Sequence, residues 1–234
     1  MCIQLQRLPA SILGIYGPRK DLLPERMRLL HPDAAASLLA MEGTPRRLRI
    51  SDMFRSAEAS LNAVFEKRGV QRPGYSGHNF GFSIDIDVGD CMRRFGMNKR
   101  QLDEHLAACG WVCHRKDHAL GDESWHYNFV STGSEAARYL AASTRSTSTA
   151  PALEARIREH YGAAMDLSPT EVQGALRRLR LYSGAVDGDL GPLSRQAIRI
   201  FQRAWGLAIT GSVDAITART LAFVAAELVI AGAP

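Results

Sequence analysis

The chain of 234 residues has no run of 18 or more apolar residues, so the sequence predicts no transmembrane helix. Its first twenty residues have no basic region ahead of the apolar ones, and Arg7 and Pro9 interrupt the short apolar stretch. This pattern is not typical of a signal peptide. We therefore expect synthesis and folding in the cytoplasm, so that a target outside the cytoplasm would have to be reached by another route.

Cysteine is scarce for a chain of this length, and a disulfide framework is not expected. The four cysteines are Cys2, Cys91, Cys109 and Cys113. Cys109 and Cys113 could form a structural zinc site with His114, but a closed site needs a fourth ligand and only His118 offers one. The sequence favours a simpler interpretation, in which Cys109 is a small hydrophobic residue at the end of an apolar run.

Long basic runs and alternation of basic with aromatic residues are also lacking, so nucleic acid is not an expected partner. The net charge is nevertheless +5, and 25 of the 29 basic residues are arginine. A modest positive charge favours anionic partners such as cell-wall polymers.

Residues 142–152 combine small polar residues with a proline and show no hydrophobic periodicity. This composition is typical of a linker. It predicts a first domain over residues 1–141 and a second over residues 153–234.

The first domain mixes helical and strand patterns. Helices are predicted at 24–41 and 98–108. A further helix is predicted to begin at a cap formed by Ser51 and Asp52 and to end at Gly69. Strands are predicted at 48–51, 82–88, 111–113 and 124–130. Residues 82–88 alternate strictly between apolar and polar, which indicates a half-buried strand. The combination predicts an α+β fold in which helices pack on a small antiparallel sheet.

The second domain is predicted to be mostly helical, with helices at 171–180, 193–204 and 217–229. Two loops between these helices share the pattern Gly-x-Val-Asp, at 184–187 and 211–214. The offset of 27 residues suggests an internal duplication.

Two short segments carry the ingredients of a catalytic metal site. The segment SGHNFGFSID spans 76–85, and ESWH spans 123–126. His78, Asp85 and His126 are two imidazoles and one carboxylate, a suitable set for three protein ligands of Zn²⁺. Strand parity puts Asp85 and His126 on the polar faces of their strands. Glu123 is a further carboxylate close to the last histidine, as a general base would need to be. Each residue alone is weak support, because single histidines and aspartates are usually solvated or structural.

These segments resemble the zinc D-alanyl-D-alanine carboxypeptidase and dipeptidase family, which includes phage endolysins that cut L-alanyl-D-glutamate bonds. The first fits that family's Ser-x-His-x-x-Gly-x-x-x-Asp pattern and the second its Glu-x-Trp-His. The resemblance implies that His78, Asp85 and His126 bind one Zn²⁺ and that Glu123 is the catalytic base.

The same resemblance extends to residues that contact substrate. Phe54-Arg55-Ser56 resembles the family's Tyr-Arg-Ser/Thr segment, so Arg55 is expected to bind the substrate and stabilise its oxyanion. The alternative is an exposed arginine at the start of a helix. Ser76 is expected to bind substrate or to orient the site by hydrogen bonding, although a plain turn serine fits equally well. Trp125 is expected to pack beneath the site.

One departure leaves the scissile bond open. Ser124 stands where the carboxypeptidases usually have proline, whereas Glu123 differs from the aspartate that is more frequent in the L-alanyl-D-glutamate endolysins.

The C-terminal part, from about 167 to 223, resembles the small three-helix peptidoglycan-binding domain. This resemblance rests on YSGAVDGDLGP at 182–192 and on the apolar residues and turns that follow.

Together these features predict a monomeric, zinc-dependent peptidoglycan hydrolase of two domains, whose partner is the cell wall. Without a signal peptide, a phage endolysin released through a holin is the expected setting. Two alternatives stay open: a cellular D,D-carboxypeptidase that releases terminal D-alanine, and a non-catalytic wall-binding protein. The extra carboxylate of Glu123 argues against the latter.

Overall fold

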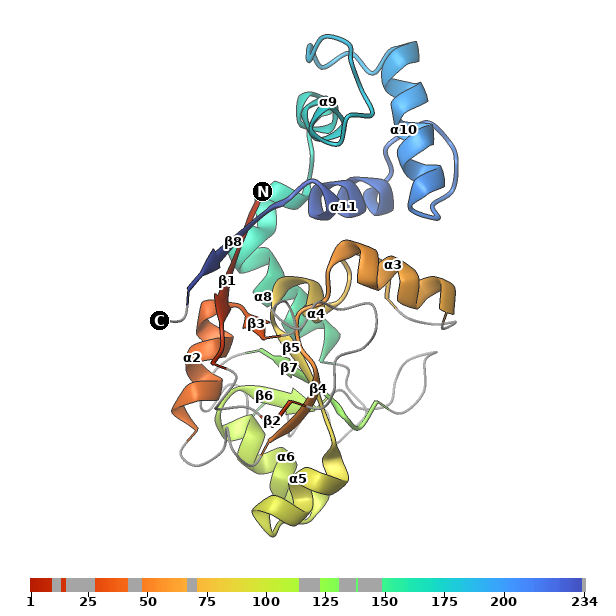
Figure 1. The fold of residues 1–234 in the computed structure, drawn as a ribbon. Coiled ribbons are helices and arrows are strands. Elements are labelled where there is room, and N and C mark those ends of the chain that lie inside the picture. The colour runs from red at the N-terminus through yellow and green to blue at the C-terminus, as the bar shows by residue number, and fades with distance from the viewer. Residues whose placement is uncertain are drawn as a thin grey trace.

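A computed structural model describes residues 1–9, 14–15, 28–41, 48–66, 71–113, 123–130, 138 and 149–232 (Figure 1). The strands are β1 Cys2–Arg7, β2 Gly14–Ile15, β3 Leu29–Leu30, β4 Arg49–Asp52, β5 Ser83–Ile86, β6 Trp111–Cys113, β7 His126–Phe129 and β8 Glu227–Ala231. The helices are α2 Pro32–Ala40, α3 Ala57–Glu66, α4 Gly77–Phe80, α5 Val88–Phe95, α6 Lys99–Ala108, α8 Ala150–Tyr161, the 3₁₀ turn Gly162–Met165, α9 Pro169–Arg178, α10 Pro192–Ala204 and α11 Ala215–Val224. The fold is therefore α+β, as predicted.

The main sheet has the order β2-β4-β5-β7-β6 and is antiparallel except for the parallel pair β2–β4. Its central strand is β5, and every residue of β5 is buried. The expectation of a half-buried strand over 82–88 was wrong, because the polar residues of β5 are buried against polar partners instead of water. The strand is also shorter than predicted, since Asp87 caps α5 by accepting a hydrogen bond from the N–H of Asp90 at 2.8 Å.

Helix α8 packs into the core that lies against this sheet. Leu153, Ile157 and Tyr161 of α8 belong to the same buried cluster as the apolar residues of β1, α2, β4, β5 and β7. The predicted linker at 142–152 is wrong at its end, because residues 150–152 form the first turn of α8. The spacing of Leu153, Ile157 and Tyr161 is the signal that indicates this helix. Residues 142–148 lie outside the described residues.

Helices α9, α10 and α11 surround a second core, above the first in Figure 1. Two buried glutamines, Gln173 on α9 and Gln202 on α10, bind loops in a similar way, but the loop residues are offset by 23 positions, so the duplication at an offset of 27 stays a prediction. The side-chain oxygen of Gln173 accepts hydrogen bonds from the backbone N–H groups of 187–188, and that of Gln202 accepts them from 210–211. Each glutamine thus ties the loop that follows its helix back to that helix in the same way.

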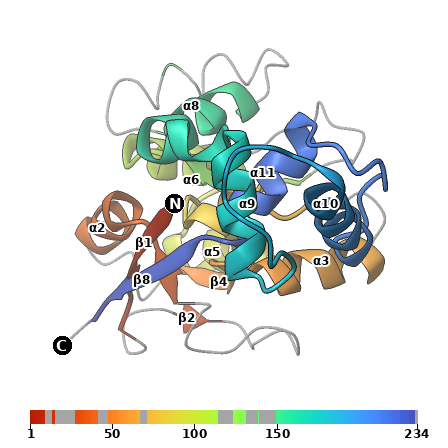
Figure 2. The same cartoon turned by 90° about the horizontal axis from the view of Figure 1, so that it is seen from above.

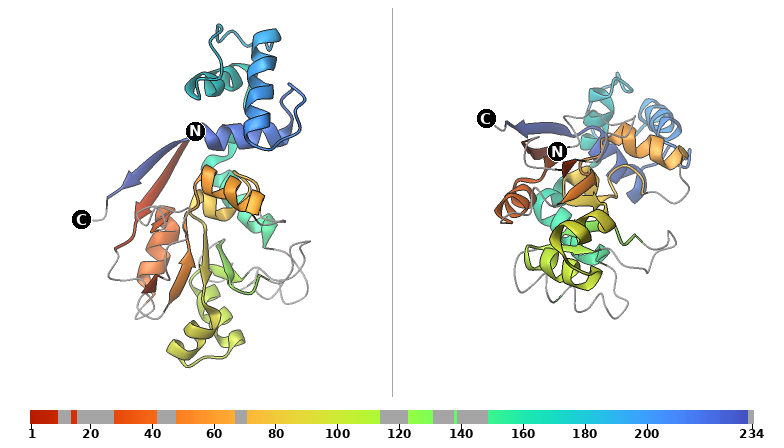
Figure 3. Two further views of the ribbon diagram at one scale, coloured as in Figure 1. Left: turned by 45° about the vertical axis from the view of Figure 1, so that its right-hand side comes forward. Right: turned by 60° about the horizontal axis from the view of Figure 1, so that its bottom comes forward.

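The C-terminal strand returns to the N-terminus of the chain. Helix α11 ends at Val224, and β8 pairs in parallel with β1 from Cys2↔Glu227 to Gln6↔Ala231, in a sheet of order β3-β1-β8 (Figures 2 and 3). The helix predicted over 217–229 was therefore too long. Pairing with the edge of β1, and not a local pattern, makes its last residues a strand. The domain boundary at 153 stays a prediction, but α8 and β8 both pack with the first part of the chain.

Two other helix starts differ from expectation. Leu29–Leu30 is a strand, and α2 begins only at Pro32, a residue that suits the first helical position. Helix α3 is capped by Ser56, whose hydroxyl accepts from the N–H of Ala59 at 3.1 Å, whereas 51–52 belong to β4. No helix in the described ranges is long and apolar enough to cross a membrane.

Candidate metal centre

His78, Asp85 and His126 converge from three elements of the fold. Asp85 on β5 and His126 on β7 are direct cross-strand partners, and His78 projects from α4. Oδ1 of Asp85 lies 2.8 Å from Nδ1 of His126 and 3.3 Å from Nε2 of His78, and the two ring nitrogens are 3.2 Å apart. Three possible ligand atoms thus form a small triangle.

The short helix α4 holds His78 in this position. Ser76 caps it: the hydroxyl accepts from the N–H of His78 at 3.3 Å, and Asn79 completes the capping box. The helix ends at Gly81, which has φ +74° and whose added Cβ would lie 2.4 Å from the backbone nitrogen of His31. Only glycine fits both the left-handed conformation and this close approach.

The outer nitrogen of each histidine is committed to an acceptor. Nδ1 of His78 lies 2.5 Å from the carbonyl oxygen of Met53, and Nε2 of His126 lies 3.0 Å from Oδ1 of Asn128. That amide oxygen also accepts from Ser83, so each imidazole must donate outward. In the neutral rings, Nε2 of His78 and Nδ1 of His126 keep the lone pairs that a metal ion would accept. Without a metal, a proton on these nitrogens is shared with Asp85.

The electrostatics of the site favour a positive charge at its centre. Burial raises the pKa of Asp85, but the charge of His78 and the hydrogen bonds with both histidines outweigh it and hold this pKa well below its usual range. Burial lowers the pKa of His126, yet the hydrogen bond and charge of Asp85 raise it overall. A proton or a metal ion can supply the charge that this site stabilises.

Arg55 lies buried beside this triangle and is not the exposed arginine that the alternative interpretation required. Its Nη2 donates to Oδ2 of Asp52 at 2.5 Å, and its backbone N–H donates to the carbonyl of His78 at 3.0 Å. Asp52 in turn is the cross-strand partner of Asp85. The sequence analysis assigned Asp52 to a helix cap and not to the site, although its position three residues before Arg55 is the signal that could have identified it.

The ESWH segment leads directly into β7. Glu123 is half-buried, and its carbonyl accepts from the N–H of His126 at 2.9 Å. Trp125 is 46% exposed, so the expectation that it packs beneath the site was wrong. The strand begins only at His126, and Trp125 lies in the preceding turn instead of on the buried face with Tyr127 and Phe129.

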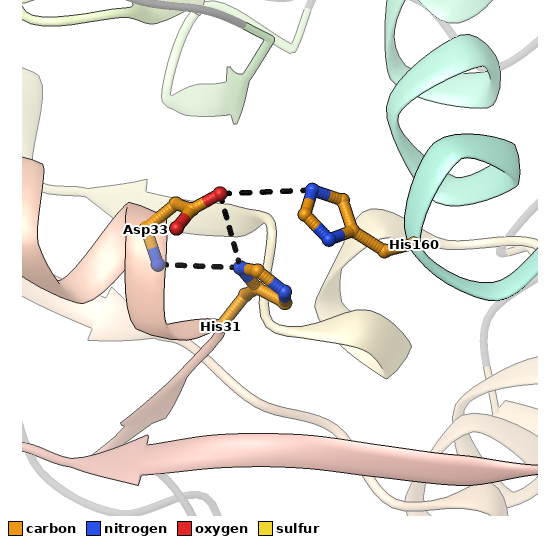
Figure 4. Close-up of side chains that lie close together, drawn as sticks. All are labelled: His31, Asp33 and His160. Atoms are coloured by element: carbon orange, nitrogen blue, oxygen red, sulfur yellow. Dashed lines mark hydrogen bonds and ion pairs between the residues drawn. The ribbon is translucent and has the colours of Figure 1, made fainter.

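A second group of possible ligands lies between α2 and α8 (Figure 4). Oδ2 of Asp33 is 3.9 Å from Nδ1 of His31 and 3.6 Å from Nε2 of His160. Nη2 of Arg156 is already 3.1 Å from the same carboxylate oxygen. The possible ligand atoms of this second group lie further apart and are more exposed than those of the first, and the guanidinium of Arg156 already supplies a positive charge. The His78 group is therefore the better candidate for a metal centre.

Two comparisons with known proteins found similarities, and one of them concerns the second core. Residues 168–221, which span α9, α10 and most of α11, match a family described as a putative peptidoglycan binding domain. A solved structure of the LdcB LD-carboxypeptidase, presented as showing the molecular basis of peptidoglycan recognition, is similar over 58% of this chain and 74% of its own, with 17% identity and a TM-score of 0.41. No curated protein matches the chain.

Proposed function

We propose that this protein is a zinc-dependent peptidoglycan peptidase that hydrolyses an amide bond of the stem peptide or cross-link. One observation carries the proposal: two imidazole nitrogens and one carboxylate oxygen lie 2.8–3.3 Å apart in a largely buried site. Ligands at about 2.0–2.1 Å from a tetrahedral Zn²⁺ lie roughly 3.3 Å from each other. The donor set therefore fits zinc with little rearrangement and leaves a fourth position for water or substrate.

Bound at this position, Zn²⁺ would lower the pKa of a water molecule to roughly 7 and polarise the scissile carbonyl. Glu123 is assigned as the general base, because it is partly exposed and directly precedes the turn that leads to His126. It accepts the proton of the attacking water and returns it to the leaving amine, so that a neutral amine departs.

Arg55 is assigned to the substrate side of the reaction. Its guanidinium is held in one orientation by Asp52, so it can donate to the carbonyl oxygen of the substrate without first losing rotational freedom. Ser76 is assigned a positioning role, because its buried hydroxyl caps α4. Its contact with substrate stays a separate prediction.

Residues 168–221 are assigned the role of holding the enzyme on the wall polymer. A bound module raises the local concentration of stem peptides around the site, which increases the rate at low substrate density without any new contact at the scissile bond. Peptidoglycan is therefore the proposed partner of both parts of the chain.

Two chemistries use the same site. An endolysin would cut L-alanyl-D-glutamate bonds or cross-links, as the His-Asn-Phe-Gly run of 78–81 favours. A D,D-carboxypeptidase would release terminal D-alanine, as Glu123 in Glu-x-Trp-His favours. The proposed setting of the first is release through a holin.

Mass spectrometry of the products from purified sacculi tests the proposal. The zinc-loaded protein is compared with Glu123→Gln and with the matched control Glu104→Gln, which alters an exposed glutamate on α6 that pairs with Arg100. We expect soluble products from the wild type and the control, and a loss of at least 100-fold in rate for Glu123→Gln.

The products also separate the two chemistries. Stem peptides that begin with D-glutamate, or opened cross-links, would identify an endopeptidase, whereas D-alanine alone would identify a carboxypeptidase. Binding to sacculi with no product from the wild type would refute the peptidase proposal and leave a wall-binding protein.

A further inference from the structure

The module of α9, α10 and α11 is attached to the rest of the protein at both of its ends. Helix α8 enters it from the first core, and β8 leaves it to pair with β1 (Figure 3). At the end of α11, Phe223 joins the first core, and its ring centroid lies 5.5 Å from that of Phe80 on α4. The module therefore packs directly against the helix that carries His78.

Arg219 of α11 makes the main polar contact across this junction. Its Nε donates to the carbonyl of Gly74 at 2.5 Å, its guanidinium carbon lies 4.3 Å from the ring centroid of Tyr75, and its Nη1 lies 2.9 Å from both carboxylate oxygens of Glu154 on α8. The guanidinium is largely buried. A planar group with several donors suits this combination of stacking, carbonyl and carboxylate contacts, and a lysine ammonium does not.

Gly74 is shaped for this approach. It has φ +84°, and a Cβ added to it would lie 3.1 Å from Cβ of Phe223 and 3.2 Å from the carbonyl oxygen of Arg219. Any side chain at this position would push α11 away from the segment that precedes α4.

The opposite side of residues 74–76 is hydrogen-bonded to Asn79, the neighbour of His78. The N–H groups of Gly74 and Ser76 donate to Oδ1 of Asn79, at 2.9 and 3.3 Å. The amide nitrogen of Asn79 donates to the carbonyl of Arg55 at 2.9 Å. Residues 74–76 thus lie between Arg219 on one side and the neighbours of His78 on the other.

We infer that Arg219 is a positioning residue for the candidate metal centre, so that the wall-binding module is also a structural part of the peptidase site. Arg219 fixes Gly74 and Tyr75, these fix the start of α4 through Ser76 and Asn79, and α4 fixes His78. The role in metal binding rests on the proposed function, whereas the ordering of 74–79 by Arg219 does not.

Two measurements on Arg219→Ala test the inference. Arg195→Ala is the matched control, because Arg195 lies on α10 of the same module and donates to the carbonyl of Leu190 within it. Hydrogen exchange of the metal-free proteins is followed at the amides of 74–79. We expect these amides to exchange roughly tenfold faster in Arg219→Ala and unchanged in Arg195→Ala, with the strands of the main sheet unaffected in both.

Cobalt replaces zinc in the second measurement because its visible spectrum reports ligand geometry. We expect Arg219→Ala to change the Co²⁺ absorption band and to weaken Co²⁺ binding by roughly 3- to 10-fold. This loss is smaller than the loss expected when a residue that is hydrogen-bonded directly to a metal ligand is removed. Arg219→Lys keeps the charge near Glu154 but loses the bond to Gly74, so it should behave as the alanine variant does if positioning is the cause.

Unchanged exchange at 74–79 in Arg219→Ala would overturn the inference, whether or not metal binds. So would an unchanged Co²⁺ spectrum and affinity in that variant beside a wild type that binds Co²⁺. A wild type that binds neither Co²⁺ nor Zn²⁺ would instead defeat the proposed function, and the exchange data would still decide whether Arg219 orders this segment.

Discussion

Asp85 and His126 face each other across two neighbouring antiparallel strands, with Oδ1 and Nδ1 2.8 Å apart. The backbone pairing of β5 and β7 fixes this distance, because side chains of directly opposite residues lie on the same face of a sheet. His78 then needs only one short helix to reach them. Two of the three proposed ligands are therefore positioned by the strand pairing of the main sheet.

Asp85→Asn should abolish stable metal binding. The substitution keeps the shape of the side chain but removes the one negative charge among the three proposed ligands, and Zn²⁺ strongly prefers a carboxylate to an amide. We expect about one zinc per chain in the wild type and less than roughly a tenth of that in the variant after dialysis, as measured by elemental analysis.

The matched control is Asp87→Asn, two residues further along the chain. Asparagine caps helices as well as aspartate does, so α5 should persist and the zinc content should equal that of the wild type. A zinc content of Asp85→Asn equal to that of the wild type would show that the metal binds at another site.

Asn128 should control the affinity of the metal without touching it. Its Oδ1 accepts from Nε2 of His126, which keeps the lone pair of Nδ1 directed at the site. Asn128→Ala removes the acceptor, and loss of such a partner usually weakens metal binding by about 10- to 100-fold.

Asn128→Asp tests the reason for that loss, because it restores an acceptor for His126. Zinc affinity measured by competition with a chromophoric chelator should recover at least partly in Asn128→Asp. Equal affinity in Asn128→Ala and the wild type would rule out the assigned tautomer of His126.

Asp52 should stabilise the folded protein as well as orient the guanidinium of Arg55. The Asp52–Arg55 pair is buried, and removal of Asp52 takes the closest counter-charge away from a buried guanidinium. Asp52→Ala should therefore lower the free energy of unfolding by about 3 kcal/mol, as measured by urea denaturation.

The double variant Asp52→Leu, Arg55→Met separates the two roles of the pair. It leaves no unpaired charge, so it should unfold at nearly the urea concentration of the wild type while losing peptidase activity. Retention of activity by this folded variant would remove Arg55 from the reaction.

Much of the candidate site could be predicted from sequence because its signals are local. The alternation around Asp85 and His126 indicated their strands and the faces on which they lie, and the register agrees with it. The helical pattern over 98–108 likewise indicated α6 correctly.

The features that sequence could not supply depend on contacts between distant segments. Strand β8 exists because β1, more than 200 positions earlier, offers it an edge for pairing, and its residues alone continue a helical pattern. Arg55 pairs with the carboxylate of Asp52, which the local sequence pattern assigns to a helix cap. Trp125 shows the opposite error: alternation started the strand two residues too early, in a turn where Trp125 is exposed.

His31 should make the protein sensitive to mild acid. Burial, with a further contribution from the nearby His160, lowers the pKa of His31 from 6.5 to about 4, although Asp33 and Glu159 oppose this shift; Arg156 also faces the ring. Because the folded state resists protonation of His31 and the unfolded state does not, the unfolded chain takes up a proton first as the pH falls. The contribution of His31 to stability is complete above about pH 6.5 and is lost progressively toward pH 4.

Urea denaturation at pH 7 and pH 5 measures this effect. Between these values the wild type should lose on the order of 1–2 kcal/mol more than His31→Gln, in which the side chain does not titrate and can still accept the hydrogen bond from the N–H of Asp33 at the start of α2. Both proteins share all other titrating groups, so their difference isolates the imidazole. Equal losses in the two proteins would mean that His31 is protonated in the folded state at pH 5, with Asp33 outweighing burial.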